Sequence, residues 1–215
     1  MWESVSRATM VGMAARVHLI GIAGPSGAGK SFLAKHLKAA LHGDVLAIDR
    51  YYRDLSHLPL EERAQANFDA PDALEHVLLV EQLARLRKGE TVPLPVYDFG
   101  AHARSRKTET LQPAKVLIVE GLFTLYWPSL RELLDTKVFV DLNEEACLAR
   151  RRARDVRERG RTPESVLQQY QATVAPMAKL FVRPTLVHAD VVVLGDERVE
   201  DGMKRVLEHF RGSMG

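Results

Sequence analysis

The residues of this sequence whose types and spacing best suit chemistry form one glycine-rich stretch near the N-terminus. It fits the pattern G-x-x-x-x-G-K-[ST] and reads Gly24-Pro25-Ser26-Gly27-Ala28-Gly29-Lys30-Ser31. Glycines allow successive backbone N–H groups to point into one concavity that suits a polyphosphate. We expect Lys30 to place a positive charge on the phosphates and the Ser31 hydroxyl to bind the Mg²⁺ that bridges them.

The segments beside this stretch are those that a phosphate-binding loop requires. Residues 17–23 form an apolar run typical of a buried strand, and residues 32–41 have helical periodicity. The helix would add the positive end of its dipole to the phosphate site. The alternative is a glycine-rich turn that binds nothing, and the order of strand, loop and helix argues against it.

Two acidic residues stand at the ends of other apolar strands. Asp49 follows the run 45–48, and Glu120 ends the run 116–119. Open α/β sheets carry their chemistry at strand ends, although an aspartate there can also simply cap a turn. In phosphate-loop enzymes an acid in the position of Glu120 holds the hydration shell of Mg²⁺ or the catalytic water. Asp49 and Glu120 are therefore candidate metal-site residues beside Ser31.

An arginine-rich segment covers residues 150–161, where seven of twelve residues are arginines. Arg150, Arg154, Arg157 and Arg161 recur at helical spacing, which predicts one helix face with four guanidinium groups. A solvated helix with ordinary i,i+4 ion pairs, Arg151 with Asp155 and Arg154 with Glu158, is the alternative. We favour a mobile arginine-bearing lid, because the transferring phosphoryl group needs cations around it.

A proline-rich extended stretch, residues 91–99, could pair with residues 107–111 across a turn at 100–106. Prolines restrict such a strand to a sheet edge, so we expect a small β-hairpin that stands off the main sheet. Tyr97, Phe99 and His102 would lie near its tip. These side chains either pack onto the domain or hold a flat ring beside the phosphate site.

The remaining pattern predicts the architecture. Further apolar strands occur at 115–121, 138–141 and 189–194, and helices at 60–66 and 73–88. The alternation of strands and helices predicts a three-layer α/β fold of the phosphate-loop NTPase type, with a five-stranded parallel sheet. We expect a single domain over residues 16–215, preceded by an extension over residues 1–15.

Composition limits the partners and the compartment. The 30 basic and 28 acidic residues give a net charge of only +2, so no global basic field favours nucleic acid or an anionic membrane. Cys147 is the single cysteine, which suits a reducing compartment, and we expect it to be a small buried apolar residue. No run is long enough for a membrane span and no signal-peptide core is present, so we expect a cytoplasmic protein.

Together these landmarks resemble the uridine kinase (uridine-cytidine kinase) family, from residue 17 to about residue 194. The loop alone is shared by many NTPases, whereas the ordered set of motifs is specific to this family. The matching pieces are the loop at 24–31, Asp49-Arg50-Tyr51-Tyr52, Asn67-Phe68-Asp69-Ala70-Pro71-Asp72, Pro95-Val96-Tyr97-Asp98-Phe99 with His102 and Arg104, Val119-Glu120-Gly121, the segment 151–161, Gln169-Tyr170, and Pro184 with Ala189-Asp190-Val191.

The resemblance implies a reaction in which ATP or GTP, with Mg²⁺, phosphorylates the 5′-hydroxyl of uridine or cytidine in pyrimidine salvage. It also suggests a homotetramer. By position, Asp49 resembles the general base, and Lys30, Arg154 and Arg161 resemble the groups that act on the transferring phosphoryl. The implied nucleoside pocket consists of Tyr52, Phe68, Asp69, Tyr97, Phe99 and His102. The implied ribose or phosphate contacts are Arg151, Arg159, Arg161 and Gln169, with Arg159 assigned to the phosphate donor.

The sequence departs from the family pattern in several places. Arg50 follows the aspartate where a small residue is common, and Ala70 stands where histidine is usual. Phe123 and Tyr126-Trp127 replace aliphatic residues, and Leu194-Gly195-Asp196 replaces a Pro-Arg-Gly stretch. None of these changes removes a residue assigned to phosphoryl transfer, so the reaction type is better supported than the acceptor.

Other functions are compatible with parts of the sequence. A phosphoribulokinase-like or pantothenate kinase-like enzyme would share the loop. The pairing of Tyr97 with His102 instead favours an acceptor that carries a planar base over a sugar phosphate or pantothenate. A nucleotide-sensing module without turnover is a further alternative, against which Asp49 and Glu120 both argue. An arginine-rich nucleic-acid binder would require a basic overall balance, which is absent.

Overall fold

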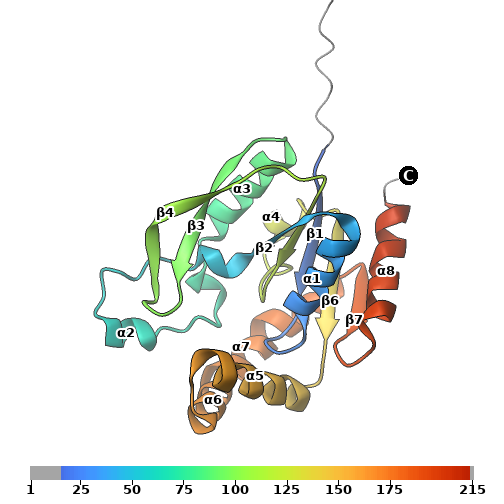
Figure 1. Ribbon diagram of the computed structural model, residues 1–215. Coiled ribbons are helices and arrows are strands. Elements are labelled where there is room, and N and C mark those ends of the chain that lie inside the picture. Colours follow the sequence, from blue (N-terminus) through green and yellow to red (C-terminus); the bar gives the residue numbers. More distant parts are fainter. Residues whose placement is uncertain (1–15, 214–215) are drawn as a thin grey trace, which may run out of the picture.

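Five parallel strands form the central sheet of this protein, in the order β2-β5-β1-β6-β7 (Figure 1). The computed structural model describes residues 16–213, and the expected extension over residues 1–15 lies outside the described residues. The strands are β1 (His18–Ala23), β2 (Asp44–Ala47), β5 (Val116–Glu120), β6 (Thr136–Asp141) and β7 (Val191–Leu194). The α/β class and the five-stranded parallel sheet predicted from the alternating pattern are therefore confirmed.

Helices cover both faces of this sheet and give it three layers. Helices α1 (Lys30–Leu41) and α8 (Val199–Gly212) share one apolar cluster with Ile20 and Ile22 of β1. Leu19 points to the opposite face, where α3 (His76–Arg87) and α4 (Pro128–Arg131) pack. Successive residues of a strand point to opposite faces, so a central strand such as β1 is apolar throughout.

Helix α3 differs from its prediction. It begins at His76 rather than at residue 73, and Val77 in its first turn is 69% exposed although it is apolar. The buried face instead includes Gln82, whose amide donates to Pro93 O and accepts from the Tyr51 hydroxyl. A polar residue occupies this face because both of its amide groups find partners there.

Strands β3 (Val92–Asp98) and β4 (Ala103–Leu111) form the expected antiparallel hairpin, separate from the parallel sheet (Figure 1). The expected turn over residues 100–106 is too long, because β4 begins at Ala103 and pairs with Asp98. Asp98 Oδ1 accepts hydrogen bonds from the backbone N–H groups of Gly100 and Ala101, which tightens the turn.

Three short elements follow β2 in the chain, before α3. They are a 3₁₀ turn at Ile48–Tyr51 that carries Asp49, helix α2 (Leu60–Ala64) and a second 3₁₀ turn at Pro71–Ala73.

Residues 16–213 contain no helix with both the length and the apolar character that a bilayer crossing requires.

The segment after β6 is almost entirely helical. Asn143 precedes helix α5 (Glu144–Arg159) and caps it by accepting from the Ala146 N–H, and Gly160, with φ 64°, follows the helix. Helix α6 (Pro163–Gln169) is capped by Thr162. It continues through a π turn (Tyr170–Val174), α7 (Ala175–Met177), a second π turn (Ala178–Val182) and a 3₁₀ segment (Arg183–His188) before β7.

Sheet register places the acidic strand ends beside the phosphate loop. Glu120 pairs with Ile22 of β1 on one side and with Ala47 of β2 on the other. The loop that starts at Gly24 and the turn that carries Asp49 therefore leave the sheet at the same edge as Glu120. Parallel strands bring their carboxyl ends together, which is why one edge collects the candidate groups.

Candidate active site

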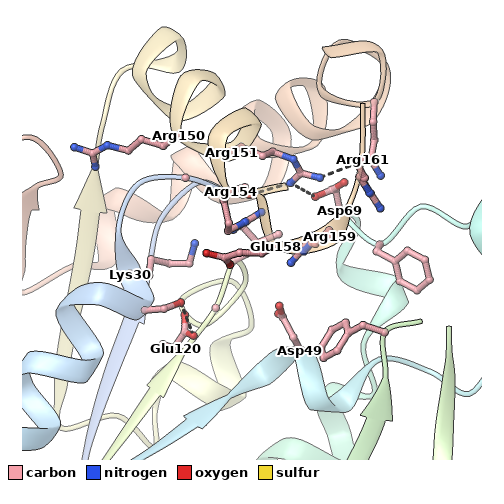
Figure 2. Close-up of a pocket in the computed structure, with 18 of the residues that line it drawn as sticks. Lys30, Asp49, Asp69, Glu120, Arg150, Arg151, Arg154, Glu158, Arg159 and Arg161 are labelled. Atoms are coloured by element: carbon pink, nitrogen blue, oxygen red, sulfur yellow. Dashed lines mark hydrogen bonds and ion pairs between the residues drawn. The ribbon is translucent and has the colours of Figure 1, made fainter. Parts of the chain in front are cut away.

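A cavity of about 820 Å³ lies at this edge of the sheet, between the glycine-rich loop, the hairpin tip and helix α5. Figure 2 shows the side chains of Lys30, Glu120 and Asp49 directed into it, below the arginines of α5. Every candidate for the nucleoside pocket and the arginine contacts lines the cavity. From the loop, Ser26, Gly27, Gly29, Lys30 and Ser31 line it, whereas Gly24, Pro25 and Ala28 do not.

The glycine-rich loop has the backbone that an anion cradle needs. Gly24, Gly27 and Gly29 all have positive φ values, of 145°, 88° and 111°. A Cβ atom on Gly24 would lie 2.3 Å from Val140 O, and one on Gly27 would lie 2.3 Å from Cys147 O. The loop thus packs against β6 and α5 at distances that only glycine allows, and this backbone conformation is the one that an anion cradle requires.

Lys30 closes the cradle from the first turn of α1. Its ammonium group is buried and donates a 3.0 Å hydrogen bond to Pro25 O. Burial lowers the pKa of Lys30 from its ordinary value, while the Glu120 and Asp49 carboxylates act in the opposite direction. A buried ammonium with a single backbone partner suits an incoming phosphate, which would supply the missing negative charge.

Ser31 and Glu120 form a polar pair beside the phosphate loop. The Ser31 hydroxyl donates to Glu120 Oε1 at 2.9 Å, and Glu120 is buried. Within residues 16–213, no three histidine, cysteine, aspartate or glutamate side chains gather to hold a metal ion by themselves. This donor set fits Mg²⁺, which proteins bind with one or two carboxylates while substrate phosphates and water complete the octahedron.

Asp49 lies on the cavity wall between the loop side and the hairpin side (Figure 2). Burial and, to a smaller degree, the neighbouring Glu120 carboxylate raise its pKa to about 6, while Lys30 acts against both. A carboxylate whose pKa lies this near neutrality is ionised at pH 7 and still basic enough to accept a proton. Asp49 is thus suited to general-base chemistry.

Aromatic rings line the opposite end of the cavity. Phe68 and His102 stack with centroids 5.2 Å apart and an interplanar angle of 21°. Tyr97 packs between Tyr52 and Phe99, at centroid distances of 5.4 and 5.2 Å. The Tyr97 hydroxyl is buried and has no hydrogen-bond partner within the described chain. Aromatic rings that line a cavity in this way suit a flat ligand.

Polar side chains of α5 and α6 join the aromatic end to the loop. Arg151 donates to the Ser26 hydroxyl at 2.9 Å and to Gln169 Oε1 at 3.0 Å, and lies 4.0 Å from Asp69 Oδ1. Arg161 also donates to Gln169. Burial raises the pKa of Asp69, and the Arg151 guanidinium opposes that shift. Gln169 of α6 thus becomes part of the arginine network.

The arginine segment is not the solvated helix that the alternative interpretation of the sequence predicts. Asp155 is fully buried, and its carboxylate lies within 4.0 Å of the guanidinium groups of Arg151, Arg154, Arg159 and Arg161. Arg154 pairs with Asp155 rather than with Glu158. The i,i+4 spacing of Arg151 and Asp155 is correct, but the pair is buried. Packing against α6 accounts for this burial.

The prediction of four arginines on one helix face is also wrong. Helix α5 ends at Arg159, and Gly160 turns the chain so that Arg161 reaches the cavity from outside the helix. Arg150 points toward the loop and donates to Gly195 O at 2.9 Å. The reversal at Gly160 follows from its left-handed conformation, which helical spacing does not reveal.

Some cavity residues were missed by sequence reasoning. Phe32, Leu122 and Glu158 line it, and Figure 2 shows Glu158 reaching into the cavity from α5. The sequence interpretation gives Glu158 only as an ion-pair partner of Arg154 on a solvated helix. The feature of the sequence that could have placed Glu158 at the site is its position one residue before Arg159, at the end of the helix.

Comparisons with known proteins agree with this geometry. Residues 19–200 match the family model described as Phosphoribulokinase / Uridine kinase family. A uridine kinase of Shewanella amazonensis is 45% identical over 202 residues, covering 89% of this chain and 95% of the relative. A uridine kinase of Chloroflexus aurantiacus is 47% identical over 183 residues, covering 84% of this chain and 88% of the relative.

Among solved structures, the phosphoribulokinase from Rhodobacter spheroides has the same fold. Its TM-score is 0.61 at 16% sequence identity, with 84% of this chain and 71% of that chain covered. The family match extends over the phosphate loop, Asp49, Glu120 and the whole arginine segment. The chain therefore belongs to the phosphoribulokinase / uridine kinase family of phosphate-loop kinases.

Proposed function

We propose that this protein is a uridine kinase, which transfers the γ-phosphoryl group of ATP to the 5′-hydroxyl of uridine and also accepts cytidine. The position of Asp49, between the phosphate cradle and the aromatic end of one cavity, carries this proposal. The similarity to uridine kinases at 45–47% identity supports the same acceptor. The product, UMP, would enter pyrimidine salvage.

In this mechanism Asp49 accepts the proton of the 5′-hydroxyl while that oxygen bonds to the γ-phosphorus. The bond between the γ-phosphorus and the β–γ bridging oxygen breaks, which yields ADP and UMP. Lys30 and Arg154 neutralise charge on the phosphates as the bond breaks. Ser31 and Glu120 would hold Mg²⁺, which supplies further positive charge to the β and γ phosphates.

The nucleoside would lie with its base at the hairpin tip and its ribose near α6. Burial and the Arg161 and Arg63 guanidiniums lower the pKa of His102, so its ring is neutral at pH 7. A neutral imidazole can donate to the O4 of uracil or, as the other tautomer, accept from the N4 amine of cytosine. Asp69 offers oxygen acceptors to the ribose hydroxyls, and the Gln169 amide nitrogen can donate to them. The rings around the cavity favour a single-ring base.

The direct test incubates the protein with Mg-ATP and a panel of acceptors: uridine, cytidine, adenosine, ribulose 5-phosphate and pantothenate. We expect phosphorylation of uridine and cytidine alone. Turnover of another acceptor, with none of either pyrimidine nucleoside, would overturn the assignment. A protein that binds ATP without any turnover would instead be a nucleotide-sensing module.

A matched variant, Asp49→Asn, tests the role of the carboxylate. Phosphorylation of uridine should fall by about 10³-fold or more, since the variant loses its proton acceptor, while ATP binding stays near the wild-type value. Asp196→Asn, at an exposed position, serves as control and should leave both unchanged.

A further inference from the structure

His102 stands at a strained position of the hairpin. Its φ is 47°, and His42 is the other non-glycine residue of the described chain with a positive φ. Left-handed backbone is costly for a residue with a Cβ atom, so it persists only where surrounding contacts hold it. Asp98 supplies two of these contacts through the N–H groups of Gly100 and Ala101. The remaining contacts come from outside the hairpin.

Arg63, on α2, holds the turn immediately before His102. Its guanidinium donates to three backbone carbonyls: Leu58 O at 2.7 Å, Ser56 O at 2.8 Å and Ala101 O at 3.2 Å. The first two bonds fix the guanidinium on its own segment. The third then ties the residue before His102 to that fixed group.

Asp54 holds the chain on the other side of His102. Its Oδ1 accepts from the backbone N–H of Arg104 at 3.1 Å. The same carboxylate accepts from the N–H and the hydroxyl of Ser56, at 3.1 and 2.7 Å, so it too is fixed on its own segment. Residues on both sides of His102 are therefore attached to the segment 54–63.

Neither Arg63 nor Asp54 lines the cavity, whereas His102, which lies between their two contacts on the hairpin, does. His102 itself stacks on Phe68 at the aromatic end of the cavity. We propose that Arg63 is a positioning residue for base recognition, and that with Asp54 it holds the His102 ring at the angle that a pyrimidine edge requires. This inference rests on the proposed function.

The test measures steady-state kinetics of Arg63→Gln with uridine. Loss of the Ala101 contact should raise KM for uridine about tenfold, with kcat and KM for ATP within about twofold of wild type. Asp54→Ala should also raise KM for uridine. Arg85→Gln is the matched control, because Arg85 is half-exposed on α3 and pairs with Glu90.

A double-mutant cycle separates positioning from general loosening of the fold. If Arg63 acts through His102, Arg63→Gln should raise KM for uridine in the wild type but not in a His102→Ala background. An equal rise in both backgrounds, or no rise in either, would overturn the inference.

NMR spectroscopy of the histidine rings decides the matter independently of activity. With His102 assigned through His102→Ala, its ring resonances should shift in Arg63→Gln and stay unchanged in Arg85→Gln. Its pKa should also rise, because Arg63 is one of the charges that lower it. Unchanged His102 resonances would overturn the positioning role. If the wild-type protein phosphorylates no pyrimidine nucleoside, but the His102 resonances still shift in Arg63→Gln, only the proposed function would be overturned.

Discussion

The Ser31 hydroxyl donates a 2.9 Å hydrogen bond to Glu120 Oε1, although 89 positions separate the two residues in sequence. The bond joins the first turn of α1 to the end of β5, and so fixes both oxygens on one side of the phosphate cradle. Two oxygens held in this way would be pre-organised to bind Mg²⁺, as the proposed function requires.

Glu120→Gln should therefore weaken the response to Mg²⁺. The variant keeps the shape of the side chain and loses its charge, so the Mg²⁺ concentration for half-maximal activity should rise on the order of tenfold. A Mg²⁺ titration at fixed ATP measures this. Glu81→Gln, at an exposed position of α3, should show the wild-type curve. Identical titrations for Glu120→Gln and the wild type would remove Glu120 from the metal site.

The raised pKa of Asp49 predicts an acidic limb in the pH profile. Asp49 must be ionised to accept a proton, so kcat/KM should be level above about pH 6 and fall about tenfold per pH unit below it. At saturating Mg²⁺, Glu120→Gln should move this limb to lower pH, because the Glu120 charge is one cause of the raised pKa. A limb that stays in place in the variant would contradict the coupling of the two carboxylates.

Because Asp155 is buried among arginines, we expect its substitution to lower the stability of the protein and not only its activity. Asp155→Asn would leave several guanidinium groups around a neutral amide in a buried setting. The free energy of unfolding should fall by about 3 kcal/mol, as expected when one partner of a buried ion pair is removed. Urea denaturation measures the change. Asp201→Asn, on the exposed side of α8, should alter stability by less than about 0.5 kcal/mol.

Gly27→Ala should disrupt the cradle while leaving most of the fold intact. Its Cβ atom would lie 2.3 Å from Cys147 O, and the φ of 88° is itself unfavourable for alanine. The loop must move away from α5, so ATP affinity should fall at least about tenfold, as calorimetry would detect. Gly212→Ala is the matched control, since its Cβ atom meets nothing within 4 Å. Unchanged ATP affinity in Gly27→Ala would show that the loop does not bind the phosphates.

The sequence determined the parts of this protein that depend on local pattern. The glycine loop, the apolar runs that become the five parallel strands and the two acids at strand ends could all be identified in advance, because strand and loop propensities act over a few residues. The aromatic and histidine residues of the hairpin could also be identified, together with the family that their order resembles.

Tertiary structure alone decided how these parts combine. The spacing of Arg151 and Asp155 is the same whether the pair is solvated or buried, and contact with Gln169 of α6 places it inside the protein. The strand order β2-β5-β1-β6-β7 and the segment that holds His102 likewise depend on contacts between residues distant in sequence. Periodicity shows which face of an element is apolar, but the partner that covers that face is chosen by packing of the whole chain.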